Sequence, residues 1–283
     1  MQKYAKWIAK GTAILALLVA MTGCGAATEQ KGASNETPAQ QAAPAQDSVK
    51  MKTYKMPNGK EIQIPAEPKR IVSDLYLGQL LSIGVKPIGT TGYSKIAPTV
   101  LIPYGTYNDD IRADIRAFGE LLDKQAEAEA WIKQFDEKAA SAREKIKTAV
   151  KDGETVGIYE LRSQKFYVLG DNWGRGGQVI YNALKLTPPP AVKEVVDANT
   201  PPKLISQEVL PQFAADHMFV TTYETKQEDK DKFFGNAVYK NLPAVKNNHI
   251  YEMTFEQMYY YDPLAIEGQL DLVVEQLLAH QAK

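Results

Sequence analysis

A chain of 283 residues, with 44% hydrophobic residues and a formal net charge of −1, is long enough for one or two domains with apolar cores. The near-zero charge and the lack of a basic stripe exclude an electrostatic case for nucleic-acid binding. Cys24 is the only cysteine, which excludes an internal disulfide.

Residues 1–23 have the features of an export signal. Lys3, Lys6 and Lys10 precede an apolar run over residues 14–21, shorter than the roughly 20 residues that span a bilayer. The stretch LLVAMTGCG resembles a bacterial lipobox, which implies lipidation of Cys24 and a protein anchored to the cell membrane on its extracellular face. The alternative is a simple secretory signal with a chance cysteine.

Residues 24–50 are predicted to be a flexible tether. The segment is rich in Ala, Gln, Ser, Thr and Pro and contains no aromatic residue. Such a composition cannot bury enough apolar surface to offset the entropy lost on ordering.

Residues 51–122 are predicted to form a first α/β lobe. YKMPNGKEIQIP indicates a hairpin, because Asn58 and Gly59 accept the positive φ of a tight turn. RIVSD, VKPIGTT and APTVLIPYG indicate strands, and LYLGQLLSIG indicates a helix closed by Gly84. This alternation predicts a parallel sheet.

Residues 123–150 contain neither Gly nor Pro and predict one long connecting helix. Asp123 is the expected N-cap, and Gly153 follows the end. At 1.5 Å per residue the helix would be roughly 40 Å long. It could therefore join two lobes.

Residues 151–283 are predicted to form a second α/β lobe. TVGIYEL, KFYVLG, HMFVTTY and HIYEM read as strands. GGQVIYNALKL, QEDKDKFFGN and ISQEVLPQF read as helices, the last with Ser206 as its N-cap. The closing helix is DPLAIEGQLDLVVEQLLAH, with Asp262 as its cap and Pro263 in its first turn.

The stretch DNWGRGGQVIYNAL, residues 171–184, places large side chains in a glycine-rich turn before a helix, and three functions compete for it. Dinucleotide binding, with Asp197 on the ribose, is disfavoured because the full G-x-G-x-x-G pattern is missing. An exported enzyme is disfavoured because there is no G-x-S-x-G or H-E-x-x-H motif, and His217, His249 and His280 are not at ligand spacing.

The third function is ligand binding. Trp173 would supply an apolar face, and Arg175 a fork of donors for an oxygen-rich ligand. Arg162 ends a strand, with Lys165 nearby. Tyr259, Tyr260 and Tyr261 precede the last helix, and three consecutive tyrosines cannot all point into the core.

The chain resembles the iron-siderophore-binding lipoproteins of bacterial ABC importers over nearly everything after residue 50. The stretches that carry the likeness are KRIVSDLYLGQLLSIGVKPIG, KIAPTVLIPYG, EAEAWIKQFDEKAASAREKI, VLGDNWGRGGQVIYNAL and YYYDP. The resemblance implies an α/β fold of two Rossmann-like lobes joined by one helix. It implies no enzymatic activity and no cofactor, only a bound ferric siderophore. The implied partners are an ABC permease with its ATPase, and the protein is expected to be a monomer.

The likeness is greatest to ferric-hydroxamate binders, which implies that Trp173 packs on the chelate and Arg175 donates to the iron-bound oxygens. Arg162, Tyr259 and Tyr260 complete the expected site, and the iron is held by the siderophore, not by a protein metal site. A ferric catecholate, heme or a corrinoid is the alternative ligand. The resemblance also implies permease docking through Glu208.

One departure concerns the first lobe. The family has a further helix–strand unit where this chain passes directly through GTTGYSKIAPT. A strand–crossover–strand unit needs about 30 residues, and no room for one exists. The first lobe is therefore expected to be one unit short.

Overall fold

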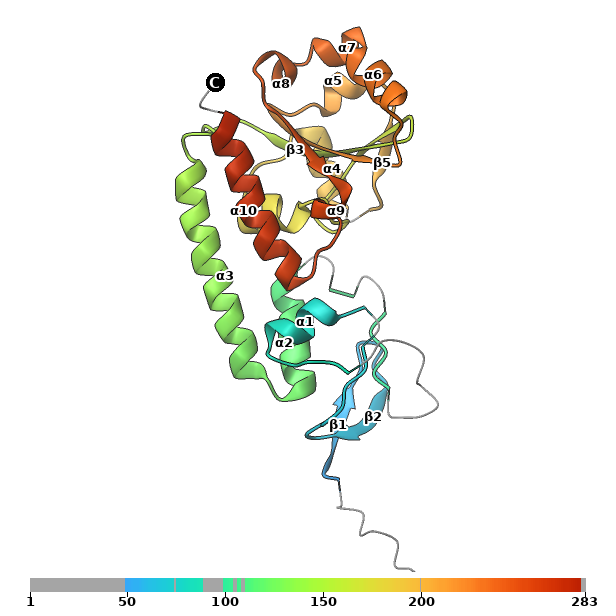
Figure 1. Cartoon of the computed structure of the whole chain (residues 1–283), viewed down its shortest axis with the longest axis vertical. Helices are drawn as coiled ribbons and strands as arrows, with labels where there is room; N and C mark the ends of the chain where they lie inside the picture. Colours follow the sequence, from blue (N-terminus) through green and yellow to red (C-terminus); the bar gives the residue numbers. More distant parts are fainter. Residues whose placement is uncertain are drawn as a thin grey trace, which may run out of the picture. The chain divides into compact units, whose positions relative to one another are not determined.

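The computed structural model describes residues 49–73, 75–88, 99–103, 106–107, 110–198 and 200–280 (Figure 1). All of them belong to one compact unit, Asp47–Lys283. Cys24 and nearly all of the predicted tether lie outside the described residues. Within the described part of the chain, no helix combines the length and the apolar character that crossing a bilayer requires.

The described chain begins with the expected hairpin. β1 (Met51–Lys55) pairs antiparallel with β2 (Glu61–Pro65), and Gly59 turns the chain with a φ of +82°. The next element is α1 (Leu77–Ser82), after which Gly84 takes a φ of +75°. The turn chemistry that predicted both features is confirmed, because each glycine occupies backbone space that other residues avoid.

The prediction of a parallel sheet in the first lobe is wrong for the described residues. In the described parts of RIVSD, VKPIGTT and APTVLIPYG, the strand-like features are an isolated bridge at Val72 and a 2.8 Å hydrogen bond from the Ile88 N–H to the Ile71 carbonyl. Residues 74, 89–91, 97–98 and 104–105 of these segments lie outside the described residues. A short apolar segment becomes a strand only when neighbouring strands complete its ladder. Among the described residues, a sheet with parallel strands therefore occurs in the second lobe alone.

The connecting helix is shorter than predicted, and a second helix precedes it. α2 (Ile111–Leu122) begins at Asp110, whose carboxylate accepts the Arg112 N–H. Asp123 does not cap the connecting helix; it ends α2 in a left-handed conformation, with a φ of +55°. α3 (Gln125–Ile146) follows after Lys124 and is about 33 Å long.

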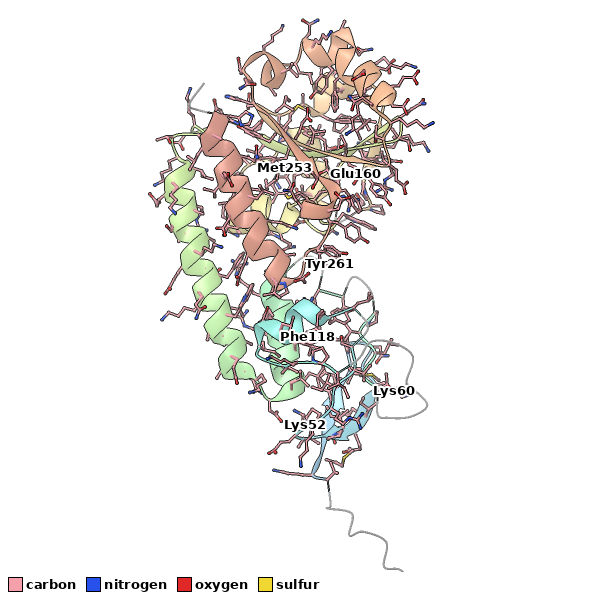
Figure 2. The ribbon with its side chains drawn as sticks, viewed as in Figure 1. Lys52, Lys60, Phe118, Glu160, Met253 and Tyr261 are labelled. Atoms are coloured by element: carbon pink, nitrogen blue, oxygen red, sulfur yellow. The ribbon has the colours of Figure 1, made fainter. Side chains whose placement is uncertain are left out.

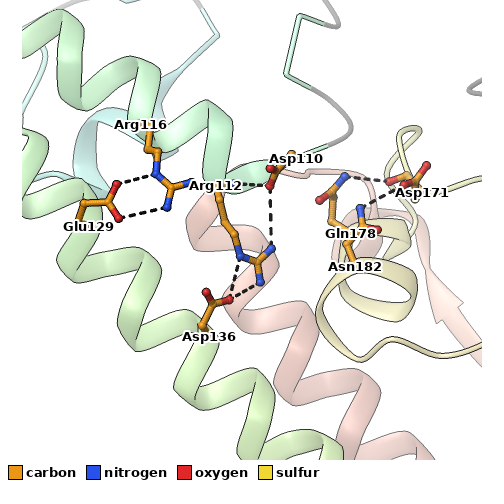
Figure 3. A network of polar contacts seen from close by, with 8 residues as sticks. All are labelled: Asp110, Arg112, Arg116, Glu129, Asp136, Asp171, Gln178 and Asn182. Atoms are coloured by element: carbon orange, nitrogen blue, oxygen red, sulfur yellow. Dashed lines mark hydrogen bonds and ion pairs between the residues drawn. The ribbon is translucent and has the colours of Figure 1, made fainter.

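Two ion pairs join α2 to α3 (Figure 3). The Arg112 guanidinium binds the Asp136 carboxylate, and Arg116 binds Glu129 through two hydrogen bonds of 2.6 and 3.2 Å. The pair at Arg116 is exposed, so water screens it and it contributes little to stability. The apolar face of α2 does more to hold the two helices together.

The second lobe contains a five-stranded mixed sheet. Its strands are β3 (Val156–Arg162), β4 (Lys165–Val168), β5 (Lys203–Ile205), β6 (His217–Tyr223) and β7 (Ile250–Thr254). In the order β5-β4-β3-β6-β7, β3, β6 and β7 run parallel, whereas β4 and β5 are antiparallel to their neighbours. The four strands predicted from apolar runs are confirmed, and β5 was not predicted.

Helices cover both faces of this sheet (Figure 1). One face packs on η1 (Gln178–Ala183), α3 and α10 (Pro263–Ala279). The other packs on residues from α4 (Pro190–Asp197), α5 (Leu210–Phe213), α6 (Gln227–Gly235), α7 (Ala237–Lys240) and α8 (Pro243–Lys246). A short helix, α9 (Phe255–Met258), follows β7.

The starts of α10 and α5 and the helix after the glycine turn were each predicted from the sequence. Asp262 caps α10 by accepting the N–H groups of Leu264 and Ala265, as expected. The helix after the glycine turn exists, but its hydrogen bonds follow the π pattern. Ser206 does not cap α5, which begins only at Leu210 after a turn.

One buried cluster runs through most of the described chain. It includes Phe118 of α2 and Met253 of β7 (Figure 2), together with the buried faces of α3 and α10. α10 contacts α1, α3 and η1. The first lobe is thus fixed to the second by α10 as well as by the connecting helix.

Candidate ligand-binding site

The carboxyl ends of the parallel strands bring the candidate residues together. Glu160 of β3 pairs in register with Thr221 of β6, and Arg162 pairs with Tyr223. Side chains alternate along a strand, so Glu160 and Arg162 project from the same face as Ile158, toward η1 and α10. This edge of an open α/β sheet is where ligands commonly bind.

The glycine-rich turn packs closely on the chain that follows β7. Gly174, Arg175 and Gly176 all have positive φ angles. A Cβ on Gly174 would lie 2.5 Å from the Tyr259 carbonyl oxygen, and the Arg175 N–H donates to the Met258 carbonyl over 2.5 Å. The glycines therefore allow two backbone segments to approach closely, and this contact fixes the position of the Arg175 Cα.

Glu160 holds both arginines. Its two carboxylate oxygens lie 2.5 Å from Arg162 Nη2 and 2.5 Å from Arg175 Nε. The Glu160 side chain is only 1% exposed and that of Arg175 8%, whereas Arg162 is 41% exposed. A carboxylate this deeply buried needs charged partners. The group carries one net positive charge.

Aromatic rings surround this ion-paired group. The Arg175 guanidinium lies 4.6 Å from the Phe255 ring centroid and 5.3 Å from that of Tyr259, while Arg162 lies 5.5 Å from Tyr223. Tyr223 and Phe255 stack with centroids 4.0 Å apart. We call Glu160, Arg162, Arg175, Phe255 and Tyr259 the arginine platform. Such a surface offers donors and apolar walls together.

The structure brings four of the five predicted ligand residues to one place. Arg162 and Arg175 share Glu160, Tyr259 lies against Arg175, and the ring of Tyr260 packs on that of Tyr259 with centroids 5.0 Å apart. Tyr259 and Tyr260 are 42% and 59% exposed. Trp173 is half-buried against the main core cluster, and its carbonyl lies 3.4 Å from Arg175 Nη1.

Sequence reasoning missed three residues of this site, Glu160, Tyr223 and Phe255. Glu160 could have been identified from the sequence, because an acidic residue inside the buried run VGIYELR needs a charged partner. Tyr223 and Phe255 carry no such signal, since their positions depend on the pairing of β3 with β6 and on the start of α9.

A cavity of about 150 Å³ lies next to the arginine platform. It is lined by the segment 259–262, by Gln79 of α1 with Leu75 and Tyr76 before that helix, and by Asp114 of α2 with Thr106 and Tyr107 before that helix. Asp114 of α2 is 5% exposed there, and its Oδ2 accepts a 2.7 Å hydrogen bond from Gln79 Nε2. The pKa of Asp114 is raised to about 7, mainly by burial; the Gln79 hydrogen bond opposes this shift and the nearby Asp262 charge adds to it.

The remaining candidate residues lie elsewhere. Glu208 is exposed in the turn before α5, and a hydrogen bond from Ser206 lowers its pKa. Lys165 is exposed at the β3–β4 turn, opposite Arg162. His217 is fully buried, with its ring nitrogens 2.8 Å from the Tyr251 hydroxyl and 3.0 Å from Glu154. Among the described residues, no three His, Cys, Asp or Glu side chains group as metal ligands do.

The sheet with its covering helices and the platform at its edge define an α/β ligand-binding protein. The sequence pattern of the family described as "Periplasmic binding protein" matches residues 91–257, so the chain belongs to that family. It is 33% identical to the Iron(3+)-hydroxamate-binding protein YxeB of Bacillus subtilis (strain 168), over 94% of this chain and 95% of that one. It is 31% identical to the Iron(3+)-hydroxamate-binding protein FhuD of the same organism, over 94% and 97%. These relatives are binding proteins, not enzymes.

Solved structures share the fold. A FhuD fold-family periplasmic binding protein, a component of a Fep/Fec-like ferrichrome ABC transporter from Bacillus subtilis, is 31% identical. It superposes with a TM-score of 0.69, over 79% of this chain and 99% of that one. Unliganded FhuD2 from Staphylococcus aureus is 25% identical, with a TM-score of 0.70 over 82% and 99%.

The alignment with YxeB also bears on the short first lobe. It spans 313 positions, whereas the whole chain has 283 residues, so at least 30 positions of the relative have no counterpart here. That the first lobe is short of one strand–crossover–strand unit stays a prediction.

Proposed function

We propose that the protein captures a ferric hydroxamate siderophore outside the cell and delivers it to an ABC permease, with its ATPase, for iron uptake. The observation that carries the proposal is the arginine platform, in a chain whose relatives are iron(3+)-hydroxamate-binding proteins. A hydroxamate siderophore satisfies iron with its own oxygens. The protein then needs only hydrogen-bond donors for those oxygens and apolar walls around the chelate.

The charge of the platform favours a hydroxamate over the alternative catecholate. Glu160 neutralises one of the two guanidinium groups, which leaves one net positive charge. A ferric tris-hydroxamate centre is neutral, whereas a ferric tris-catecholate is strongly anionic and would need more cations around it. Lys165 is an additional cation near Arg162, but it is exposed and solvated.

A fluorescence titration tests the proposal. Tryptophan emission of the protein is followed against a ferric tris-hydroxamate, its iron-free form and a ferric tris-catecholate, with a Trp173→Phe variant to identify the reporting ring. We expect saturable one-to-one quenching by the ferric hydroxamate and much weaker binding of the other two. Tighter binding of the catecholate, or conversion of the siderophore to a product, would contradict the proposal.

We propose further that the protein is anchored through a lipid on Cys24 at the extracellular face of the membrane. The support is the short apolar run that ends in MTGC before a polar tether. A Cys24→Ala version should be released to the medium or remain unprocessed. Membrane binding of this version at the mature size would show that the anchor lies elsewhere.

Glu208 is the proposed contact with the permease in the second lobe. It is exposed, and the hydrogen bond from Ser206 favours its charged form. Losing a charged contact at an interface mainly lowers the association rate and the salt dependence of binding. Glu208→Gln should therefore reduce uptake without changing siderophore affinity, and unchanged uptake would contradict this role.

A further inference from the structure

The cavity beside the arginine platform has the opposite chemistry to the platform. Five tyrosines line it, together with Asp114 and Asp262, and none of the described lining residues is basic. Tyrosine faces attract cations, and carboxylates do so more strongly. Asp262 already uses Oδ1 to accept two backbone N–H groups at the start of α10. Asp114 is the more deeply buried of the two acids, and its Oδ1 accepts no hydrogen bond from the described residues.

Two buried acceptors in this cavity lack partners. Asp114 Oδ1 and Gln79 Oε1 make no hydrogen bond to any described residue, although Asp114 is 5% exposed and Gln79 4%. The Gln79 side chain donates from Nε2 to Asp114 Oδ2, so its Oε1 points away from this hydrogen bond and has no partner among the described residues. A buried acceptor without a hydrogen bond costs stability. The two acceptors therefore suggest that the protein binds a ligand group that carries N–H donors.

The size of the cavity limits that group. A volume of about 150 Å³ corresponds to roughly five water molecules at about 30 Å³ each. Pockets that hold a whole drug-sized ligand are several times larger, at about 300–1,000 Å³. The cavity therefore suits a short pendant arm of a ligand whose main body lies on the arginine platform, next to Tyr259 and Tyr260.

We infer that this cavity binds an alkylammonium arm of the siderophore, with Asp114 and Gln79 accepting its N–H groups. The inference rests on the proposed function and narrows it, because it selects ferric hydroxamates that carry a free primary amine. The arm replaces the missing donors of both acceptors and places its charge among tyrosine rings. The neutral chelate centre remains with Arg162 and Arg175.

Paired ligands test the inference. Ferrioxamine B, a linear ferric tris-hydroxamate with one primary ammonium group, is titrated against its N-acetylated form, which has the same chelate without that charge. We expect the wild-type protein to prefer the ammonium form by about tenfold or more at pH 8, as for a charge-assisted hydrogen bond. Asp114→Asn should abolish this preference by lowering the affinity for ferrioxamine B.

Controls separate this inference from folding and from the proposed function. Asp271→Asn changes an exposed aspartate on α10 and should keep the preference. A thermal melt checks that Asp114→Asn is folded, and asparagine can still accept from Gln79. Binding of both ligands with equal affinity by the wild type, or a preference that survives in Asp114→Asn, overturns the inference alone. Binding of neither ligand overturns the proposed function and this inference with it.

A pH series gives a second readout. In the ligand-free protein, the described titratable neighbours of Asp114 in the cavity are Asp262 and the tyrosines. None of these neighbours is a cation. The carboxylate must be ionised to pair with the ammonium group, and its pKa is about 7 without ligand. The preference for ferrioxamine B should therefore grow from about pH 5.5 to about pH 8. A preference that is flat over this range in the wild type contradicts the assignment of Asp114.

Discussion

Arg175 combines a strained backbone with a buried charge. Its φ of +54° is unusual for a residue with a side chain, and the carbonyl of Met258 and the carboxylate of Glu160 hold it there. We predict that Arg175→Gln lowers ferric-hydroxamate affinity about tenfold to a hundredfold, because a charged hydrogen bond contributes about 1.5–3 kcal/mol. Calorimetric titration measures the change.

The matched control for Arg175 is Arg116→Gln. Arg116 also pairs with a glutamate, Glu129, but at an exposed site between α2 and α3. Its loss should leave affinity unchanged. Equal affinity of Arg175→Gln and the wild type would remove Arg175 from the site.

Asp114 lowers the stability of the empty protein at neutral and alkaline pH. Its pKa is about 7 in the folded state, against 3.8 as the ordinary value, so protonation of this carboxyl favours folding. This stabilisation is fully present below pH 3.8 and is lost as the pH rises through 7. We predict that Asp114→Asn stabilises the ligand-free protein by a few kcal/mol at about pH 8, since each pKa unit corresponds to about 1.4 kcal/mol.

Urea unfolding of both proteins at about pH 8 and about pH 5 measures this effect. The advantage of Asp114→Asn should shrink at the lower pH, where the folded wild type is mostly protonated at this site. A variant that is less stable than the wild type at pH 8 would show that the Asp114 carboxylate is well solvated or paired.

At the scale of elements, the glycine turn is positioned by its contact with the end of α9. Gly174 and Gly59 both have positive φ, but only at Gly174 would a Cβ meet another backbone. We predict that both alanine variants lose about 1–2 kcal/mol from the left-handed conformation, and that Gly174→Ala loses more. Only Gly174→Ala should also lose siderophore affinity, because its clash displaces Tyr259 and Arg175.

Thermal melts and titrations of the two variants provide the comparison. If Gly59→Ala and Gly174→Ala are equally destabilised and both bind normally, the close packing of the turn does not position the site.

Elements marked by local chemistry could be predicted, and those that depend on distant partners could not. Asp262 and Pro263 mark the start of α10, and the apolar runs mark β3 and β6. α2 was missed although Asp110 caps it and its apolar residues have helical spacing. Apart from the hairpin, the described residues of the first lobe do not form the predicted strands, because an apolar run gives only a tendency and strand pairing depends on the partner.

The same limit applies to the site. Arg162, Arg175 and Tyr259 were predictable as a group from the turn and from their places at element ends. That a single carboxylate, Glu160, holds both arginines follows from the register of β3 and the closeness of the glycine turn. The cavity at Asp114 requires α2, which the prediction lacked.

At the scale of the whole molecule, the first lobe exposes an unusual amount of apolar surface. Of twelve exposed large hydrophobic residues in the described chain, six lie between Val72 and Leu101. This stretch flanks the position where the family's additional unit is expected. We predict that inserting the corresponding segment of YxeB between α1 and α2 raises both stability and ferric-hydroxamate uptake, because it covers this surface and completes the lobe that would meet the permease.

Urea midpoints and uptake assays in cells that carry either form measure these effects. The inserted form should unfold at a higher urea concentration and support faster uptake. Equal stability and equal uptake would show that the short lobe is functionally complete.

A crystal structure of the protein with a ferric tris-hydroxamate bound tests whether the chelate binds at the arginine platform. We predict that iron-bound oxygens lie within hydrogen-bonding distance of Arg162 or Arg175. The chelate should also contact Trp173 or Tyr259, while Glu160 still holds both guanidinium groups. A chelate bound away from the arginine platform, or iron coordinated directly by protein side chains, would contradict it.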